Sequence, residues 1–342
     1  MHSEIITTPA FSRLDPETTA RLRRGRSGKA TRAQSAVEYT LFAVFGLTIV
    51  LSLVALIVIN SPQHKMVPNH VADGLTQGRV NILVIGTTTR DGRTDTDSIM
   101  LVSVKPQTHQ TAMISVPRDL WVRMGRYGTH RLGAAEAVGQ ASGYPGEGTG
   151  LTADTVEQVT GQPVHAYVRL EGKDLKSTID AMGGIDIDVA HSFFESKSRD
   201  RFYRGTQHMD GQRAIRFAKS HAVVGPQNDR FAREMREQQV IVAVLKKLET
   251  LPAQQRDGLL HTRIFNGTSS TNLESSQMAL LTGAVHTDAV QHVSLEPLMT
   301  VIDLPSIGDT DEAVQPRGGD FTQLRSIARD VFASPTVALL SR

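Results

Sequence analysis

The sequence has no cysteine, few aromatic residues and almost no net charge. Its 342 residues include 37 Lys and Arg against 35 Asp and Glu, and 5% are aromatic. Because cysteine is absent, disulfide frameworks, thiolate metal sites and thiol catalysis are excluded, and Asp, Glu and His remain as possible metal ligands. The net charge of +2 excludes a broadly basic nucleic-acid binder and an acidic disordered chain.

Positive charge is concentrated in residues 1–36, which hold seven Arg and Lys against three Asp and Glu. This basic tail is followed by a long uncharged stretch, in which Leu41–Ile59 is an apolar run of 19 residues interrupted only by Gly, Thr and Ser. A helix rises about 1.5 Å per residue, so such a run matches a hydrocarbon core of about 30 Å. We therefore predict a transmembrane signal-anchor helix over residues 37–60.

A buried core helix and a cleaved signal peptide are the alternatives for this run. Buried helices seldom stay apolar on all sides for so long. A cleaved signal would end in a small-residue cleavage site, whereas this run ends Ile59-Asn60-Ser61-Pro62. The positive-inside rule then places the basic tail in the cytoplasm and the rest of the chain outside. Residues 61–78, with two prolines and two glycines, are predicted to form a tether.

Residues 79–342 show strand and helix patterns in alternation. Short apolar runs rich in β-branched residues predict buried strands, and longer segments closed by glycine or proline predict helices. The expected strands are Val80–Ile85, Ser98–Val104, Thr111–Val116, Ala166–Leu170 and Ile185–Val189. The expected helices are Thr152–Val159, Glu171–Met182, Asp229–Leu248, a helix capped by Asn272 through Leu281, and Phe321–Phe332 capped by Asp320. This alternation indicates an α/β fold, a layered α-β-α domain with a mixed central sheet.

Two charged segments directly follow expected strands. Residues 86–98 contain two Arg and three Asp, and a loop at a strand end could hold a divalent ion beside an anionic group. An ordinary solvated turn explains the same residues equally well. In the second segment Pro117 ends a strand and fixes the corner that carries Arg118, which could bind phosphate or simply pair with Asp119.

A third charged segment lies on the longest expected helix. Arg233, Arg236 and Glu237 are spaced i, i+3 and i+4, so they share one face of the helix. Mixed charges at this spacing usually form an exposed, ion-paired face.

Taken in order, these segments resemble the LytR-CpsA-Psr family of cell-wall glycopolymer ligases. The resemblance covers roughly residues 79–250 and rests on Asn81–Gly86, Asp97–Val102, Ser115–Asp119, Gly183–Val189 and Arg233–Gln238. It implies a membrane-anchored phosphotransferase of the bacterial cell membrane that transfers a polyprenyl-pyrophosphate-linked glycopolymer to a peptidoglycan hydroxyl, forming a phosphodiester. It also implies Mg²⁺ as cofactor, and no nucleic acid is expected as partner.

The resemblance further assigns roles to individual residues. The implied catalytic residues are Arg118, Asp97 and Arg233. The implied pyrophosphate-binding residues are Arg90, Arg118, Arg131, Lys219, Arg233 and Arg236. Asp97 matches the family's metal ligand, Asp95 and Asp91 are the further candidate ligands, and Asp97 or Asp95 could accept the proton of the acceptor hydroxyl.

Three departures from the family pattern act against pyrophosphate binding. Thr88 stands in place of a metal-binding Asp, Lys219-Ser220-His221 in place of Arg-x-Arg, and Glu237 in place of Gln. The alternative function is therefore a catalytically weakened scaffold or regulator that keeps the fold and binds polyprenyl (pyro)phosphate lipids or cell-wall polymer. DNA binding has little support, because the short basic tail beside a membrane would contact anionic lipid instead.

Overall fold

The computed structural model describes residues 68–91, 93–221, 223–224, 230–260, 268–304 and 311–333. The predicted cytoplasmic tail and transmembrane helix, residues 1–60, lie outside these ranges. Within the described residues, no helix is both long enough and apolar enough to cross a membrane. The end of the predicted tether belongs to the folded part, because Val71–Thr76 forms helix α2 and the side chain of Val71 is fully buried.

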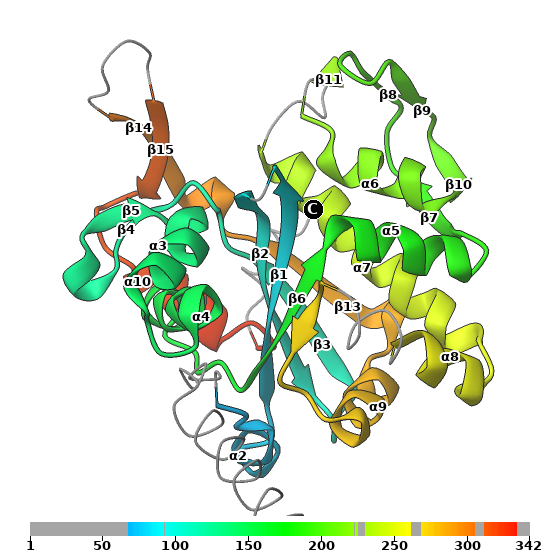
Figure 1. Ribbon diagram of the computed structural model, residues 1–342, viewed down its shortest axis with the longest axis horizontal. Helices are drawn as coiled ribbons and strands as arrows, with labels where there is room; N and C mark the ends of the chain where they lie inside the picture. Colours follow the sequence, from blue (N-terminus) through cyan, green and yellow to red (C-terminus); the bar gives the residue numbers. More distant parts are fainter. Residues whose placement is uncertain are drawn as a thin grey trace, which may run out of the picture. The chain divides into compact units, whose positions relative to one another are not determined.

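A six-stranded mixed sheet forms the centre of the fold (Figure 1). Its strands, in spatial order, are β12 (Ser270–Thr271), β6 (Ala166–Glu171), β1 (Val80–Arg90), β2 (Arg93–Lys105), β3 (Gln110–Ser115) and β13 (Val290–Ser294). β1, β2 and β3 are antiparallel neighbours, whereas β6 runs parallel to β1 and β13 runs parallel to β3. The predicted mixed sheet is confirmed.

Helices cover both faces of this sheet (Figure 1). One face packs against α3 (Ala135–Ser142), α4 (Glu147–Thr160) and α10 (Thr322–Arg329), and the other against α7 (Arg230–Thr250) and α9 (Ser275–Ala284). Alternate residues of β1 point to opposite faces of the sheet. Leu83 and Ile85 pack in the core under α3, α4 and α10, and Ile82 packs in the core under α7 and α9. Strands buried on both faces read as continuous apolar runs, which is why the sequence pattern was recognisable.

A smaller layer packs on the outer side of α7. It contains α5 (Gly172–Ala181), α6 (Gly211–Lys219), a hairpin of β7 (Ile185–Val189) with β10 (Gly205–Met209), and a sheet of β8 (Phe193–Glu195), β9 (Asp200–Phe202) and β11 (Val223–Val224). Its core is a separate cluster centred on Phe193, Phe202 and Phe217, to which the side of α7 that faces this layer contributes Val240 and Val244. Helix α7 therefore lies between the central sheet and this outer layer.

The remaining elements are short and lie at the edges of these layers. They are the hairpins β4 (Trp121–Arg123) with β5 (Thr129–Arg131) and β14 (Met299–Leu304) with β15 (Asp311–Pro316), helix α8 (Ala253–Leu260), and 3₁₀ turns at Gly125–Tyr127, Leu132–Ala134, Thr287–Ala289 and Glu296–Leu298.

Several details of the predicted elements are wrong. Residues 86–98 do not form a loop, because β1 and β2 continue as a hairpin whose pairing runs from Thr87 opposite Thr96 to Arg90 opposite Arg93. The β-branched threonines of this segment favour strand over turn. Helix α9 starts at Ser275 rather than after Asn272, because Glu274 forms a capping box with Gln277. Helix α10 starts at Thr322 and ends at Arg329 with Phe321 at its N-cap, so the predicted cap Asp320 lies one residue earlier, where its carboxylate accepts a hydrogen bond from the Thr322 amide.

Candidate functional site

Asp97 sits at a β-bulge between the two longest strands. Gly86 pairs with Ser98 and Thr87 pairs with Thr96, so Asp97 is an extra residue with no partner in β1. A bulge redirects the side chain of the unpaired residue. Here the carboxylate accepts a hydrogen bond from Thr88 Oγ1 at 2.5 Å and lies between the hairpin and α6.

Lys219 reaches the same carboxylate from the last residue of α6. Its Nζ lies 2.6 Å from Asp97 Oδ2 and also donates to Thr88 Oγ1. Helix α6 approaches α5 closely, since a Cβ on Gly211 would lie 2.1 Å from the Lys176 carbonyl oxygen. This close contact sets how far the end of α6 extends toward the sheet.

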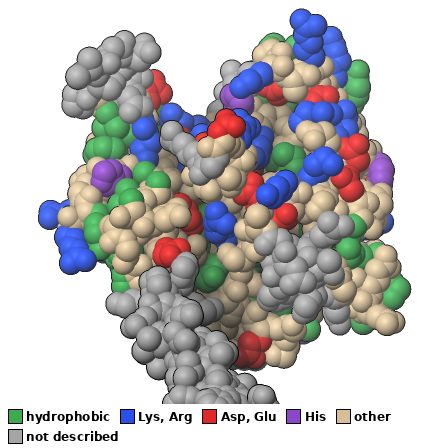
Figure 2. All heavy atoms as spheres, in the orientation of Figure 1, with side chains coloured by type: hydrophobic (Ala, Val, Ile, Leu, Met, Phe, Trp, Pro, Cys, Tyr) green, Lys and Arg blue, Asp and Glu red, His purple; other side chains and the backbone are tan. Residues whose placement is uncertain are grey.

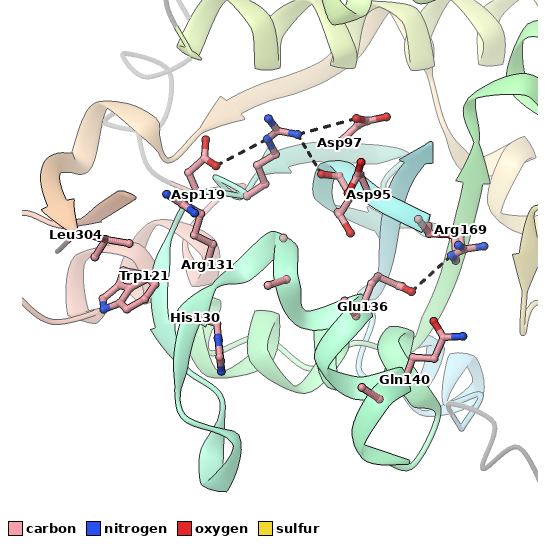
Figure 3. Close-up of a pocket in the computed structure, with 17 residues that line it drawn as sticks. Asp95, Asp97, Asp119, Trp121, His130, Arg131, Glu136, Gln140, Arg169 and Leu304 are labelled. Carbon is pink, nitrogen blue, oxygen red and sulfur yellow. Dashed lines mark hydrogen bonds and ion pairs between the residues drawn. The ribbon is translucent and has the colours of Figure 1, made fainter. Parts of the chain in front are cut away.

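Arg118 lies near the other oxygen of the Asp97 carboxylate. Its Nη1 donates to the Thr96 carbonyl at 3.2 Å and lies 4.0 Å from Asp97 Oδ1, while its Nε lies 3.9 Å from Asp119 Oδ1 (Figure 3). The Gly133 amide donates to the Arg118 carbonyl at 2.7 Å, which fixes the backbone of the corner after Pro117. The long ion-pair distances leave the guanidinium able to form shorter bonds to an anion.

Helix α7 contributes an ion pair behind these groups. Arg233 Nε lies 3.7 Å from Glu237 Oε1, and both side chains are less than one fifth exposed, at 18% and 14%. Burial raises the pKa of Glu237 to about 7, although Arg233 opposes this rise, and the nearby Asp97 adds to it. Arg236 is buried, donates to the Ser220 carbonyl at 2.5 Å and lies over the Phe193 ring, so it holds the chain directly after Lys219.

Buried polar side chains fasten α7 to the sheet. Gln238 Nε2 donates to Ser115 Oγ at 2.8 Å and to the Val293 carbonyl at 2.9 Å, and its Oε1 lies 2.8 Å from His292 Nδ1. Burial raises the pKa of Glu234 to about 8, and Ser294 Oγ donates to its carboxyl group. The helix that carries Arg233 is therefore held in a fixed position over β3 and β13.

The polar groups border a cleft of about 1160 Å³ (Figure 3). Its charged lining residues are Asp95, Asp97, Arg118, Asp119, Arg131, Glu136 and Arg169, and its other linings include Trp121, His130 and Gln140. On the face drawn in Figure 2, Lys and Arg side chains lie among Asp and Glu around a hollow in the surface. The cleft is therefore lined by both signs of charge.

An apolar slot lies on the other side of Asp97, between the sheet and helices α5, α7 and α9. This slot has a volume of about 160 Å³ and is lined almost entirely by aliphatic side chains, among them Ile82, Val102, Val168, Leu245, Met278 and Leu281. A narrower cavity of about 60 Å³, here called the neck, is lined by Asp97, Lys219 and Glu237. The neck shares Ile241 with the slot and Asp97 with the cleft, so it is the neighbour of both.

The structure brings some of the implied residues together and leaves others apart. Asp97, Lys219 and Arg118 meet, the Arg233–Glu237 pair lies next to them, and Asp95 and Arg131 line the cleft. Arg131 also donates to the Glu312 carbonyl at 2.9 Å. Arg90 and Asp91 are exposed at the far end of the hairpin and do not line the cleft, and Arg236 is buried behind it.

The donor set at Asp97 does not fit Mg²⁺. Magnesium needs close to octahedral coordination by oxygen at 2.0–2.1 Å. It is usually held by one or two carboxylates together with waters and substrate phosphates, so whether it fits here depends on the Asp97 carboxylate. The carboxylate oxygen that would bind it is instead in contact with the ammonium group of Lys219.

Two charged residues of this region were not predicted from the sequence. Glu171 is buried, and its carboxylate accepts hydrogen bonds from the Thr89 amide at 2.9 Å and from Thr87 Oγ1 at 3.1 Å, which orients the hairpin. Arg169 lines the cleft and lies 3.7 Å from Glu136. Both are charged residues in a strand whose other residues are mostly apolar. Charged residues in such a strand could have indicated from the sequence that they belong to a site.

Comparison with known proteins places the chain in a family. The LytR_cpsA_psr family model matches residues 58–307, which is more than half of the chain, so the chain belongs to the LytR-CpsA-Psr family. Two relatives are named polyisoprenyl-teichoic acid–peptidoglycan teichoic acid transferase TagU. The one from Bacillus cereus is 29% identical over 201 residues, which are 58% of this chain and 62% of the relative. The one from Oceanobacillus iheyensis is 28% identical over 205 residues, which are 59% of this chain and 61% of the relative. The matched region thus spans less than two thirds of these relatives.

Solved structures support the same fold. B. subtilis TagV has a TM-score of 0.57 at 23% identity, covering 74% of this chain and 96% of that one. The family protein YwtF (TagT), solved with bound octaprenyl pyrophosphate lipid, has a TM-score of 0.54 at 17% identity, covering 75% and 92%. At these identities the likeness concerns the fold alone.

Proposed function

We propose that this protein is a phosphotransferase that moves a glycopolymer from a polyprenyl pyrophosphate carrier to a peptidoglycan hydroxyl, forming a phosphodiester. The observation that carries the proposal is a charged cleft that contains Arg118, next to a neck that contains Lys219 and, beyond the neck, an apolar slot. A pyrophosphate-linked lipid needs both kinds of surface. The names of the TagU relatives and the lipid bound to TagT support this choice of substrate class.

The apolar slot would take the first part of the polyprenyl chain. Burying an alkyl chain contributes about 0.8 kcal/mol for each CH₂ group, so even a few carbons in the slot would orient the substrate. A chain entering through the neck passes Ile241 and leaves its headgroup beside Asp97, Lys219 and Arg118. The glycan would then extend into the larger polar cleft.

The chain's own cations would stabilise the reacting phosphate. The acceptor oxygen forms a bond to the phosphorus that carries the glycan, and the bond between that phosphorus and the bridging oxygen breaks. Polyprenyl monophosphate leaves, and Arg118, Lys219 and Arg233 offset the charge that builds on its oxygens. Asp95, which lines the cleft, would accept the proton of the hydroxyl group, with Asp97 as the second candidate.

We also propose that residues 37–60 anchor the protein in the bacterial cell membrane with its N-terminus in the cytoplasm. The carrier lipid resides in the membrane, and an anchored enzyme would meet it at the surface. The uncharged apolar run supports this arrangement, as does the excess of basic residues before it.

Alanine at Arg118 tests the proposed function. We expect the Arg118→Ala variant of the full chain to transfer polyprenyl-pyrophosphate glycan to peptidoglycan at least about 100-fold more slowly, because an aimed cation at the phosphate is lost. Arg126→Ala is the matched control, since Arg126 is exposed and stacks on Tyr127 outside the cleft. Transfer by Arg118→Ala at the wild-type rate would refute the proposal.

A binding protein without transferase activity is the second candidate. It is favoured by one observation, the contact between Lys219 and the carboxylate that was expected to bind metal. In that case the wild type would bind a polyprenyl pyrophosphate and transfer nothing, with or without added Mg²⁺. Binding and turnover measured on the same preparation separate the two functions.

A further inference from the structure

We propose that Lys219 supplies the positive charge that a divalent ion would otherwise bring to Asp97, so that this site binds a pyrophosphate without a metal. The inference rests on the proposed function for its ligand. It concerns how the pyrophosphate headgroup is bound, and it gives a function to Thr88 and Lys219, two residues that differ from the family pattern.

The contacts of the ammonium group are those of a bound cation. Lys219 Nζ is in contact with Asp97 Oδ2 at 2.6 Å and with the hydroxyl oxygen of Thr88. A lysine ammonium has three donor hydrogens, so two are used here and one can be directed to a phosphate oxygen. A metal ion bound to the same carboxylate oxygen would come into steric and electrostatic conflict with the ammonium group.

The charge of the site is consistent with an ammonium group in place of a divalent ion. A divalent ion between two carboxylates gives a neutral group, and so does one ammonium beside one carboxylate. Threonine at position 88 removes one negative charge but keeps an oxygen that bonds to Asp97 at 2.5 Å and accepts from Lys219. Lys219 stands where the family pattern has Arg, so the positive charge itself is not new; Thr88 lowers the negative charge beside it, and its hydroxyl joins Lys219 to Asp97 across 131 residues of the chain.

Other carboxylates do not complete a metal site. Asp95 lines the cleft opposite Thr88 in the hairpin, Asp91 is exposed near the turn, and Glu237 is paired with Arg233. Within the ranges that the structure describes, three candidate ligands are nowhere grouped together.

The position of Lys219 is fixed from both sides along the chain. Helix α6 is packed against α5 at Gly211, and the carbonyl of Ser220, the next residue, accepts a hydrogen bond from buried Arg236 at 2.5 Å. A cation held in place before the ligand arrives loses little freedom on binding. Arg236 thus acts as a positioning residue for Lys219 and not as a ligand of the phosphate.

The first test measures metal binding by the full chain, using Mn²⁺ and electron paramagnetic resonance. We expect the wild type to bind no stoichiometric Mn²⁺ at about 1 mM, and the double variant Thr88→Asp/Lys219→Ala to gain one site, since it restores two carboxylates without the ammonium. The inference is overturned if the wild type binds one equivalent and Asp97→Asn removes it.

The second test measures the affinity for geranylgeranyl pyrophosphate by calorimetry, in EDTA and in Mg²⁺. We expect the wild-type affinity to change by less than about twofold between the two, and Lys219→Met to lose at least about tenfold in EDTA. Lys246→Met is the matched control, because Lys246 forms a surface pair with Asp288 at 2.8 Å. Thermal unfolding of each variant confirms that it is folded.

The two ideas fail in different ways. If EDTA weakens wild-type binding at least about tenfold and Mg²⁺ restores it, the site uses a metal and the inference is wrong, while the proposed function stands. The same holds if Lys219→Met binds like the wild type in EDTA. If the wild type binds no prenyl pyrophosphate under either condition, the proposed function is refuted, and the Mn²⁺ experiment still decides whether Lys219 excludes a metal.

Discussion

Replacing Glu234 with Gln should remove a specific pH dependence from the stability of the domain. Glu234 lies on the buried side of α7, and its carboxyl group accepts a hydrogen bond from Ser294 on β13. Burial raises its pKa from the ordinary 4.5 to about 8, so the folded protein holds this carboxyl in its neutral form at neutral pH. Glutamine has nearly the same shape and stays neutral at every pH.

The sign and size of the effect follow from the two pKa values. Between about pH 4.5 and pH 8 the folded state binds one more proton at Glu234 than the unfolded state, so wild-type stability falls as the pH rises. Each pKa unit corresponds to 1.36 kcal/mol, and the gap of about 3.5 units gives a loss of about 5 kcal/mol across the window. Glu234→Gln should lack this loss and gain stability over the wild type as the pH rises.

Urea unfolding of the full chain at several pH values measures this difference. The quantity of interest is the unfolding free energy of Glu234→Gln minus that of the wild type, because other titrating groups cancel in it. Glu249→Gln, at an exposed position on the same helix, controls for the loss of one carboxylate from α7. A difference that stays constant from pH 5 to pH 8 would show that Glu234 is not held neutral, and the reasoning would be refuted.

Three further substitutions probe the neck and the packing of α6 and α7. Ile241→Trp, at the junction of neck and slot, should lower the affinity for a polyprenyl lipid at least about tenfold in calorimetry and leave inorganic pyrophosphate binding unchanged. Gln238→Leu removes the hydrogen-bond donor of two buried groups, Ser115 Oγ and the Val293 carbonyl. It should therefore lower the unfolding free energy, measured in urea, by about 2–4 kcal/mol. Gly211→Ala would place a Cβ 2.1 Å from the Lys176 carbonyl and should lower the same free energy by about 1–3 kcal/mol.

Each of these substitutions has a control. Ile241→Leu conserves volume and should bind the lipid normally, and an equal loss of pyrophosphate binding in Ile241→Trp would contradict a blocked slot. An unchanged urea midpoint in Gln238→Leu would show that its hydrogen bonds contribute nothing to stability. Gly283→Ala is the control for Gly211→Ala, because a Cβ at Gly283 meets nothing within 4 Å.

The central strands and main helices could be predicted because their signals are local. Strand Ile185–Val189 has the predicted bounds, and the helix that ends before Gly161 ends there because Gly161 adopts a φ of 63°. The sequence could not show that Ile185–Val189 pairs with β10 outside the central sheet, since strand partners depend on contacts between distant residues. The continuation of β1 and β2 beyond Gly86 was hidden by the Asp residues and Gly92 of this segment, because Asp and Gly are typical of turns.

The sequence could predict which residues belong to the site but not how they contact one another. Motif matching selected Asp97, Arg118 and Lys219 separately, and the structure brings them together. No local pattern indicates that the amine of Lys219 reaches Thr88, because that contact depends on how α6 packs beside the sheet. Arg236 was grouped with Arg233 by helix spacing, but the helix rotation about its axis turns Arg236 toward the Phe193 ring.

The bulge in β2 limits how this segment can change in length. The hairpin beyond Thr87 and Thr96 could be extended or trimmed by one residue in each strand, because the pairing of the remaining residues would not change. Deleting Thr96 would instead place Asp97 opposite Thr87, restore a regular ladder and turn the carboxylate away from its present position. The length of this hairpin can therefore vary without moving Asp97, provided that the extra residue of the bulge in β2 is kept.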